Sequence, residues 1–295
     1  MSYVVARILR VPLVVLVIGL ILALATPAAM ARYTAFQIRG GSSCIQTLSG
    51  PFGRATVINC ERTLSDVYSR PFFELMSDAA LRSLVLLAGA GILALVVGSL
   101  LGMAMALLRR RALASGGLIG LLSLMAAIPS FFLAYFLQIT VIVLGASEGG
   151  HVLPVFGFGY DEHVVLPLIS ISIPAIAYTA QLTATRMQDV LDADFVTTAN
   201  AKGLLPSWII AVHVLPHVRP VVLEALGSGL RVSVASLPII EYLFGWNGIG
   251  ALGLQAAASR DSAAFVFAAV VLVAVFAVLS AIADLSRPRA LYRSG

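Results

Sequence analysis

The sequence is poor in charge, and its 295 residues include a single lysine, Lys202. Charged residues make up 11% of the chain and hydrophobic residues 60%, whereas an ordinary soluble domain carries about 25% charged residues. A soluble fold of this size cannot bury so much apolar surface, so the composition predicts an all-helical integral membrane protein. The net charge of +5 comes from basic residues that flank apolar runs. Membrane topology requires this pattern, which argues against binding of nucleic acid.

Motifs for nucleotide hydrolysis and for metal-dependent hydrolysis are also absent. A P-loop needs G-x-x-x-x-G-K-[ST], but Lys202 follows Ala201 and precedes Gly203. The sequence contains no H-E-x-x-H. His213 and His217 have the i, i+4 spacing of metal ligands on a helix, but no third ligand is near them in the sequence. We therefore expect no enzyme activity, no metal site and no cofactor in this chain.

Cysteine is almost absent, since Cys44 and Cys60 are the only two. Both lie in one polar segment that follows the first apolar run. If this segment lies outside the cytoplasm, in an oxidising compartment, we expect the two to form a disulfide. The alternative is a pair of free thiols.

Apolar runs of about 20 residues, long enough to cross a bilayer as helices, occur six times in the chain. They cover residues 11–31, 83–108, 118–144, 164–185, 221–240 and 262–283. The first run also fits a cleavable signal peptide, because Arg7 and Arg10 precede it and Ala31 ends it. Between the first two runs, residues 62–82 have the apolar spacing of a helix.

The distribution of arginine and lysine predicts the orientation in the membrane. With the N-terminus in the cytoplasm, eleven of these residues lie inside and seven outside, so both termini are expected to be cytoplasmic. We expect an N-terminal helix with an outer loop over residues 1–82. A core of five spans follows over 83–286, with a cytoplasmic loop at 186–219, and a cytoplasmic tail covers 287–295.

The longest polar interlude in the second half of the chain is residues 194–216. Small residues come first, then Gly203, which can end a helix, and then an apolar run that ends at Pro216. We expect a short helix, a turn and a second helix. Asp192 and Asp194 favour the N-terminal end of the first helix. Such a knob between two membrane spans has a shape that can dock into another protein.

From Pro129 onward, the sequence resembles the membrane subunits of binding-protein-dependent ABC importers. Within them it resembles the first-permease type of the dipeptide, oligopeptide and nickel family. The matching segments are 128–132, 166–167, 185–187, 190–191, 194–204, His213 with Pro216, and 241–250. The resemblance covers roughly residues 83 to 286, and it implies the type I ABC importer permease fold. The first eighty residues depart from the family, since its Pro-Gly-Asp segment is absent.

By this resemblance, residues 194–216 fit the cytoplasmic signature E-A-A-x3-G-x9-I-x-L-P. Thr197 replaces the acidic residue and His213 the isoleucine. The signature implies a coupling helix that docks into a groove on a separate ATPase subunit. The residues expected to form this coupling loop are Asp194, Phe195, Thr197, Thr198, Ala199, Lys202, Gly203, His213, Leu215 and Pro216.

The fifth apolar run carries two ionisable residues, Glu224 and Arg231, seven positions apart and therefore on one side of a helix. Small residues such as Ser228 and Ser233 extend this polar stripe. We expect Glu224, Ser228, Arg231 and Ser233 to line the translocation pathway. The alternative is close packing of small residues against neighbouring helices.

The resemblance implies a non-catalytic permease subunit of an ATP-driven importer in the inner, cytoplasmic membrane. Its expected partners are a second permease, two ATPase subunits that bind ATP and Mg²⁺, an extracytoplasmic binding protein and membrane lipid. The expected cargo is a short peptide, with nickel or other metal chelates, opines and glutathione as alternatives. The rival classes are a secondary transporter that works alone and an exporter-type or assembly subunit.

Overall fold

The computed structural model describes residues 45–50, 53–58, 63–108, 112–148 and 153–286. The predicted first span, Cys44, Cys60 and the C-terminal tail lie outside the described residues, so the predictions about them stay predictions. The expected division at residues 82 and 286 also stays a prediction.

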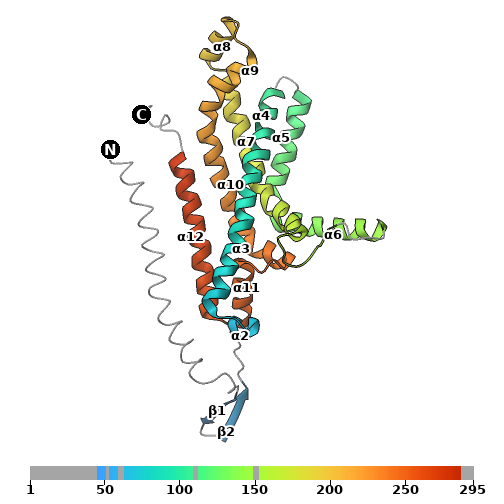
Figure 1. The fold of residues 1–295 in the computed structure, drawn as a ribbon, viewed down its shortest axis with the longest axis vertical. Coiled ribbons are helices and arrows are strands. Elements are labelled where there is room, and N and C mark those ends of the chain that lie inside the picture. The colour runs from blue at the N-terminus through green and yellow to red at the C-terminus, as the bar shows by residue number, and fades with distance from the viewer. Residues whose placement is uncertain (1–44, 51–52, 59–62, 109–111, 149–152, 287–295) are drawn as a thin grey trace, which may run out of the picture. The chain divides into compact units, whose positions relative to one another are not determined.

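A short hairpin comes first in the described part of the chain. Strands β1 (Ile45–Gly50) and β2 (Gly53–Ile58) pair antiparallel, with Ile45 opposite Ile58 and Gly50 opposite Gly53. The sequence had predicted a polar outer loop here, without strands. The rest of the described chain is helical, which confirms the predicted helical membrane fold (Figure 1).

The helices follow one another through short connections. They are α2 (Leu64–Tyr68), α3 (Phe72–Leu93), the π-helix η1 (Ala94–Gly98), α4 (Ser99–Leu107), α5 (Ala112–Ala127), α6 (Ser130–Glu148), the 3₁₀ helix η3 (Glu162–Val164), α7 (Val165–Leu191), α8 (Asp194–Ala201), α9 (Pro206–Trp208), the π-helix η4 (Ile209–Val214), α10 (Leu215–Phe244), α11 (Ile249–Ser259) and α12 (Ser262–Ser286). The predicted helical spacing in residues 62–82 is confirmed by α2 and the start of α3.

Four helical segments of the described chain are long and apolar enough to cross a membrane. They are Phe72–Leu107, Glu162–Leu191, Pro206–Phe244 and Ser262–Asp284. The pair Gly120–Ala127 and Ser130–Ala146 passes the same test only when taken together, and it bends by 100°. Counting this pair as one span, five of the six predicted runs correspond to helices.

The bend between α5 and α6 falls at Pro129. Proline has no N–H to donate to the helix ladder, and its ring clashes with the preceding turn. The N–H of Ile128 still bonds to the carbonyl of Leu124, at 3.0 Å, and that of Phe132 starts a new helix on the carbonyl of Pro129, at 2.9 Å. The helix α6 therefore leaves the direction of α5 (Figure 1). The sequence had predicted one continuous run here.

Residues of the described chain group into two compact units. The first lies within 1–83 and 247–274, and the second within 84–246 and 275–295. In the first, α2 and the start of α3 share an apolar core with α11 and the start of α12. Its buried members are Leu64, Leu75, Met76, Ala79, Ile249, Leu252, Ala256, Ala264 and Ala268.

Polar side chains join the helix ends within this first unit. Asp261 accepts hydrogen bonds from the backbone N–H of Leu64, at 2.9 Å, and of Ala264, at 3.1 Å. One carboxylate thus caps α12 and holds the start of α2. The hydroxyl of Ser83 accepts from the N–H of Ile249 at 2.8 Å, which satisfies a free donor at the start of α11.

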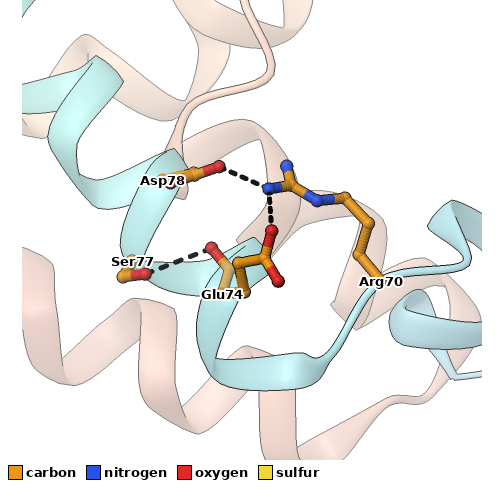
Figure 2. Close-up of polar contacts among 4 residues, drawn as sticks. All are labelled: Arg70, Glu74, Ser77 and Asp78. Carbon is orange, nitrogen blue, oxygen red and sulfur yellow. Dashed lines mark hydrogen bonds and ion pairs between the residues drawn. The ribbon is translucent and has the colours of Figure 1, made fainter.

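Arg70 precedes α3 and contacts two carboxylates on its first turns. The guanidinium lies 2.6 Å from Glu74 and 2.7 Å from Asp78 (Figure 2). These two hydrogen bonds raise the pKa of Arg70 above its usual range. The hydroxyl of Ser77 donates to the carbonyl of Glu74 at 3.1 Å.

In the second unit, α7 and α10 approach each other most closely at Gly229. A Cβ placed there would lie 2.6 Å from the Cα of Ala175, so only glycine fits. The buried hydroxyl of Ser233 donates to the carbonyl of Ile171 at 2.7 Å, one turn further along. The helix α4 meets α7 in the same way, since a Cβ at Gly102 would lie 2.6 Å from the carbonyl oxygen of Ala180.

Candidate functional site

The predicted cytoplasmic loop forms a helix, a turn and a second helix, as expected from the sequence. It lies at one end of α7 and α10 (Figure 1). The residue before α8, Ala193, has an extended backbone with φ −72° and ψ 146°, so α8 is a separate helix and not a continuation of α7. Asp194 lies in the first turn, where a negative charge interacts favourably with the helix dipole.

One face of α8 packs against the start of the next helix. Val196 and Ala199 are buried in a cluster with Ile209 and Val214 of η4. The opposite face, with Thr197, is exposed. The apolar spacing of α8 therefore serves to fix it on the second helix of the knob, and its polar residues face away.

Gly203 ends α8 in a left-handed conformation, with φ +76°. Its N–H bonds to the carbonyl of Asn200 at 2.9 Å, and the N–H of Leu204 bonds to the carbonyl of Ala199 at 3.3 Å. These two bonds form a Schellman motif, which requires a positive φ at the glycine position. A Cβ at Gly203 would meet no atom within 4 Å. Glycine is needed here for its backbone conformation, and the space around it is open.

The outer surface of the knob combines apolar and polar side chains. Phe195, Leu205 and Trp208 are exposed to 42%, 71% and 57%. Lys202 and Thr198 are also exposed. Thr198 donates its hydroxyl to the carbonyl of Asp194 at 2.9 Å. The sequence reasoning included Phe195 in this surface but missed Leu205 and Trp208, because the family signature leaves their positions unspecified.

The second helix starts with Pro206 at its first position and widens into a π-helix before α10. At the junction, the N–H of Leu215 bonds to the carbonyl of Ile210, five residues back. Pro216, which follows, has no N–H to donate. Of the remaining predicted residues, His213 and Leu215 are half-buried and Pro216 is exposed.

His217 lies just beyond this junction and touches α8. Its Nδ1 lies 2.8 Å from the carbonyl oxygen of His213. Its ring stacks on Phe195, with a centroid distance of 5.3 Å and an interplanar angle of 29°. From the sequence, His213 was expected in the coupling loop, whereas His217 was considered only as a metal ligand, because the family signature gives it no role.

The predicted pathway residues occupy two environments on α10. Arg231 donates to the hydroxyl of Ser228 at 2.9 Å, and both are half-buried, as is Glu224. Ser233 is fully buried in the contact with α7. The structure thus joins Ser228 and Arg231 and places Ser233 in the helix packing. Whether the four line a pathway stays a prediction.

The other end of α10 is closed by a loop that precedes α7. Gly245 has φ +68°, and a Cβ there would lie 2.7 Å from the ring of Phe156. The N–H of Gly157 donates to the carbonyl of Phe244 at 2.8 Å. Phe158 lies edge-on against the buried Trp246, with a centroid distance of 4.8 Å.

The buried side-chain amide of Gln138 connects α6 to this loop and to the end of α10. Gln138 donates from Nε2 to the carbonyls of Val155, at 3.3 Å, and Leu243, at 3.1 Å. Both acceptors belong to backbone that is outside regular hydrogen bonding at a helix end or loop. The single amide in an otherwise apolar run was the sequence signal for this contact.

The same loop carries an exposed acid–histidine pair. Asp161 accepts from His163 Nδ1 at 2.6 Å and from the His163 backbone N–H at 3.1 Å. These hydrogen bonds lower the pKa of the Asp161 carboxyl from its usual range. With Glu162, Leu153 and Pro154, the pair lines an open hollow of about 440 Å³.

The comparisons with known proteins agree with this architecture. A family model described as "Binding-protein-dependent transport system inner membrane component" matches residues 98–292, well over half of the chain. The chain belongs to this family, and it is a multi-pass membrane protein.

Two relatives carry names of transport permeases. The dipeptide transport system permease protein DppB of Bacillus subtilis is 29% identical over 170 residues, which are 58% of this chain and 53% of that protein. The glutathione transport system permease protein GsiC of Shigella flexneri is 29% identical over 134 residues, which are 45% of this chain and 42% of that protein. The matched part therefore spans about half the length of these curated relatives.

A solved structure has the same fold. A chain of the structure titled "Inward facing conformations of the MetNI methionine ABC transporter" superposes with a TM-score of 0.54 and 16% identity. The match covers 74% of this chain and 99% of that chain. The predicted type I importer permease fold is thereby confirmed.

Proposed function

We propose that this chain is the membrane-spanning permease subunit of an ATP-driven importer in the cytoplasmic membrane. It passes short peptides that an extracytoplasmic binding protein delivers. Family membership supports the class of transporter, since the family is described as binding-protein-dependent. The names of the two relatives support a peptide cargo, because one transports dipeptides and the other glutathione, itself a small peptide.

The observation that carries the proposal is the exposed knob at the end of the longest helical segment. Pro206–Phe244 has 39 residues, which corresponds to about 58 Å of helix, whereas a bilayer with its headgroups is about 40–45 Å thick. The segment that begins at Pro206 therefore projects beyond the lipid. Leu205 and Trp208 are exposed at that end, and apolar surface in water favours a protein partner.

That partner, in our proposal, is the ATPase subunit, which supplies the ATP and Mg²⁺ chemistry. The exposed surface of α8 and α9 docks into a groove on the ATPase, and Gly203 sets the angle between the two helices. Two ATPase subunits would act on this chain and on a second, homologous permease. When the ATPases close, they would move both knobs and change the side of the membrane to which the pathway opens.

A substitution at Gly203 tests the docking. Gly203→Leu places a bulky side chain on the exposed turn, where no atom lies within 4 Å, so insertion into the membrane stays intact. We expect at least about a tenfold loss of copurified ATPase, because one misplaced contact in an interface costs on the order of 1.4 kcal/mol or more. Gly203→Ala, which imposes the same left-handed strain with a small side chain, is the matched control and retains more of the ATPase than Gly203→Leu.

Transport by the purified chain tests the rival class. In vesicles that contain only this chain, we expect no peptide uptake with or without ATP. Uptake without ATP and without partner subunits would identify a secondary transporter and overturn the proposal. Uptake that requires all subunits, ATP and the binding protein supports it.

A further inference from the structure

In the part of the knob that the structure describes, the side chain of His217 contacts both α8 and η4 from the start of α10. The ring stacks on Phe195 of α8, and Nδ1 contacts the carbonyl of His213 in η4. His217 itself belongs to the first turn of α10. Three segments of the chain, α8, η4 and α10, therefore meet at one imidazole.

The hydrogen bond determines the orientation of the ring. A carbonyl oxygen only accepts hydrogen bonds, so at 2.8 Å the Nδ1 of His217 carries the proton and donates it. The bond holds the imidazole over the preceding turn of its own helix. From there the ring presents a flat face to Phe195, at an angle of 29° that is close to parallel stacking.

The orientation of α8 depends on side-chain contacts such as this one, because the backbone changes direction at both ends of the helix. Ala193 is extended at the first end, and Gly203 is left-handed at the second. Between them the helix has only eight residues. On its inner side, Val196 and Ala199 pack in one cluster with residues of η4 and with Val218 of α10. This apolar packing holds the inner side of α8, and the stack of Phe195 on His217 adds a second contact between α8 and α10.

We propose that His217 is a positioning residue that fixes α8 to the start of α10, so that a displacement of α8 is passed to the membrane helix. The inference rests on the proposed docking of α8 onto an ATPase.

Three substitutions separate the ring from the hydrogen bond. His217→Ala removes both, His217→Phe keeps an aromatic ring that can stack, and His217→Gln keeps a donor without a ring. Each is tested in the complete transporter in proteoliposomes, with permeases, ATPases and binding protein. The measurements are copurified ATPase, ATP hydrolysis and uptake of a labelled dipeptide. Leu223→Ala, at another exposed position of α10, is the control for side-chain loss.

For His217→Ala we expect peptide uptake to fall about tenfold, because both a stacking contact and a hydrogen bond are lost. Copurified ATPase and the rate of ATP hydrolysis stay at the level of the unmodified protein, so more ATP is hydrolysed per peptide. We expect His217→Phe to recover uptake to within about threefold, since stacking contributes without the hydrogen bond. His217→Gln recovers less than His217→Phe.

Several results would overturn the inference. Unchanged uptake with His217→Ala means that the stack passes no movement to α10. Loss of copurified ATPase with that variant means that His217 contacts the ATPase directly. A His217→Phe variant as impaired as His217→Ala excludes the ring as the linking element. If the unmodified chain copurifies no ATPase at all, the proposed function itself fails, and this outcome is distinct from the other three.

Discussion

The two ends of the second unit both use a left-handed glycine, but they surround it differently. Gly245 follows α10 with φ +68° and lies under the ring of Phe156, and Gly203 follows α8 with φ +76° and has no neighbour within 4 Å. The tryptophans differ in the same way, since Trp246 is fully buried and Trp208 is 57% exposed. At the first end the ring of Phe156, itself 69% exposed, lies over the glycine. At the other end no side chain lies over Gly203, and in the proposed function a partner subunit docks there.

The largest difference in stability is expected when leucine replaces each of the two glycines in turn. Leucine in a left-handed conformation costs roughly 1–2 kcal/mol at either site. At Gly245 the side chain must also displace Phe156, so we expect Gly245→Leu to lower the free energy of unfolding by about 3 kcal/mol in total. Gly203→Leu is expected to cost only the conformational part. Thermal unfolding in detergent measures both.

Equal losses of stability at the two glycines would contradict the difference between the two ends. Phe156→Ala combined with Gly245→Leu sharpens the test, because it removes the displaced ring. We expect the double variant to be more stable than Gly245→Leu alone.

A second, smaller loss of stability is expected when the buried amide of Gln138, near Gly245, is removed. Gln138→Leu leaves the carbonyls of Val155 and Leu243 without their side-chain donor. We expect a loss of about 2 kcal/mol, since an unsatisfied buried acceptor costs roughly 1–3 kcal/mol. Gln181→Leu is the control, because the Gln181 amide lies 3.5 Å from Ser123 in an exposed contact. Equal melting temperatures for the two variants would show that the closed end does not depend on Gln138.

The smallest effect is expected from the exposed pair beside that end. The hydrogen bonds from His163 lower the pKa of Asp161, so their stabilisation is present above the usual carboxyl pKa. It is lost as the pH falls through the lowered pKa of the folded state. We therefore expect Asp161→Asn to lower the melting temperature slightly at about pH 6, and to lower it less as the pH falls below the usual carboxyl pKa. A difference that grows toward low pH would contradict this assignment.

The apolar runs and the knob could be predicted from the sequence because both depend on local signals. A run of 20 apolar residues has few alternatives to a membrane helix. The helix–turn–helix around Gly203 follows from small residues, a glycine and a proline in order. The family signature then implied a role for the knob, and the matching family model supports the same class of protein.

Other features depend on contacts that no local pattern specifies. Pro129 marks the place of the bend within one apolar run, but its size of 100° follows from no local pattern. The stack of His217 on Phe195 joins residues separated by the whole turn at Gly203. Ser233 has the same chemistry as Ser228, and only the close approach of α7 and α10 places it in the buried interface. The hairpin β1–β2 lies in a segment whose apolar residues show no strict alternation.

The close contact of Gly229 with Ala175 could act as a pivot for the helical segment Pro206–Phe244. Treated as a rigid rod, it extends roughly 35 Å from this contact to Pro206 and roughly 22 Å to Phe244, at 1.5 Å per residue. If the fulcrum is the glycine, a push on the long arm swings the short arm in the opposite direction through about two-thirds of the distance. A movement of a few ångströms at the knob would thus reach the opposite end of the helix reduced by only a third.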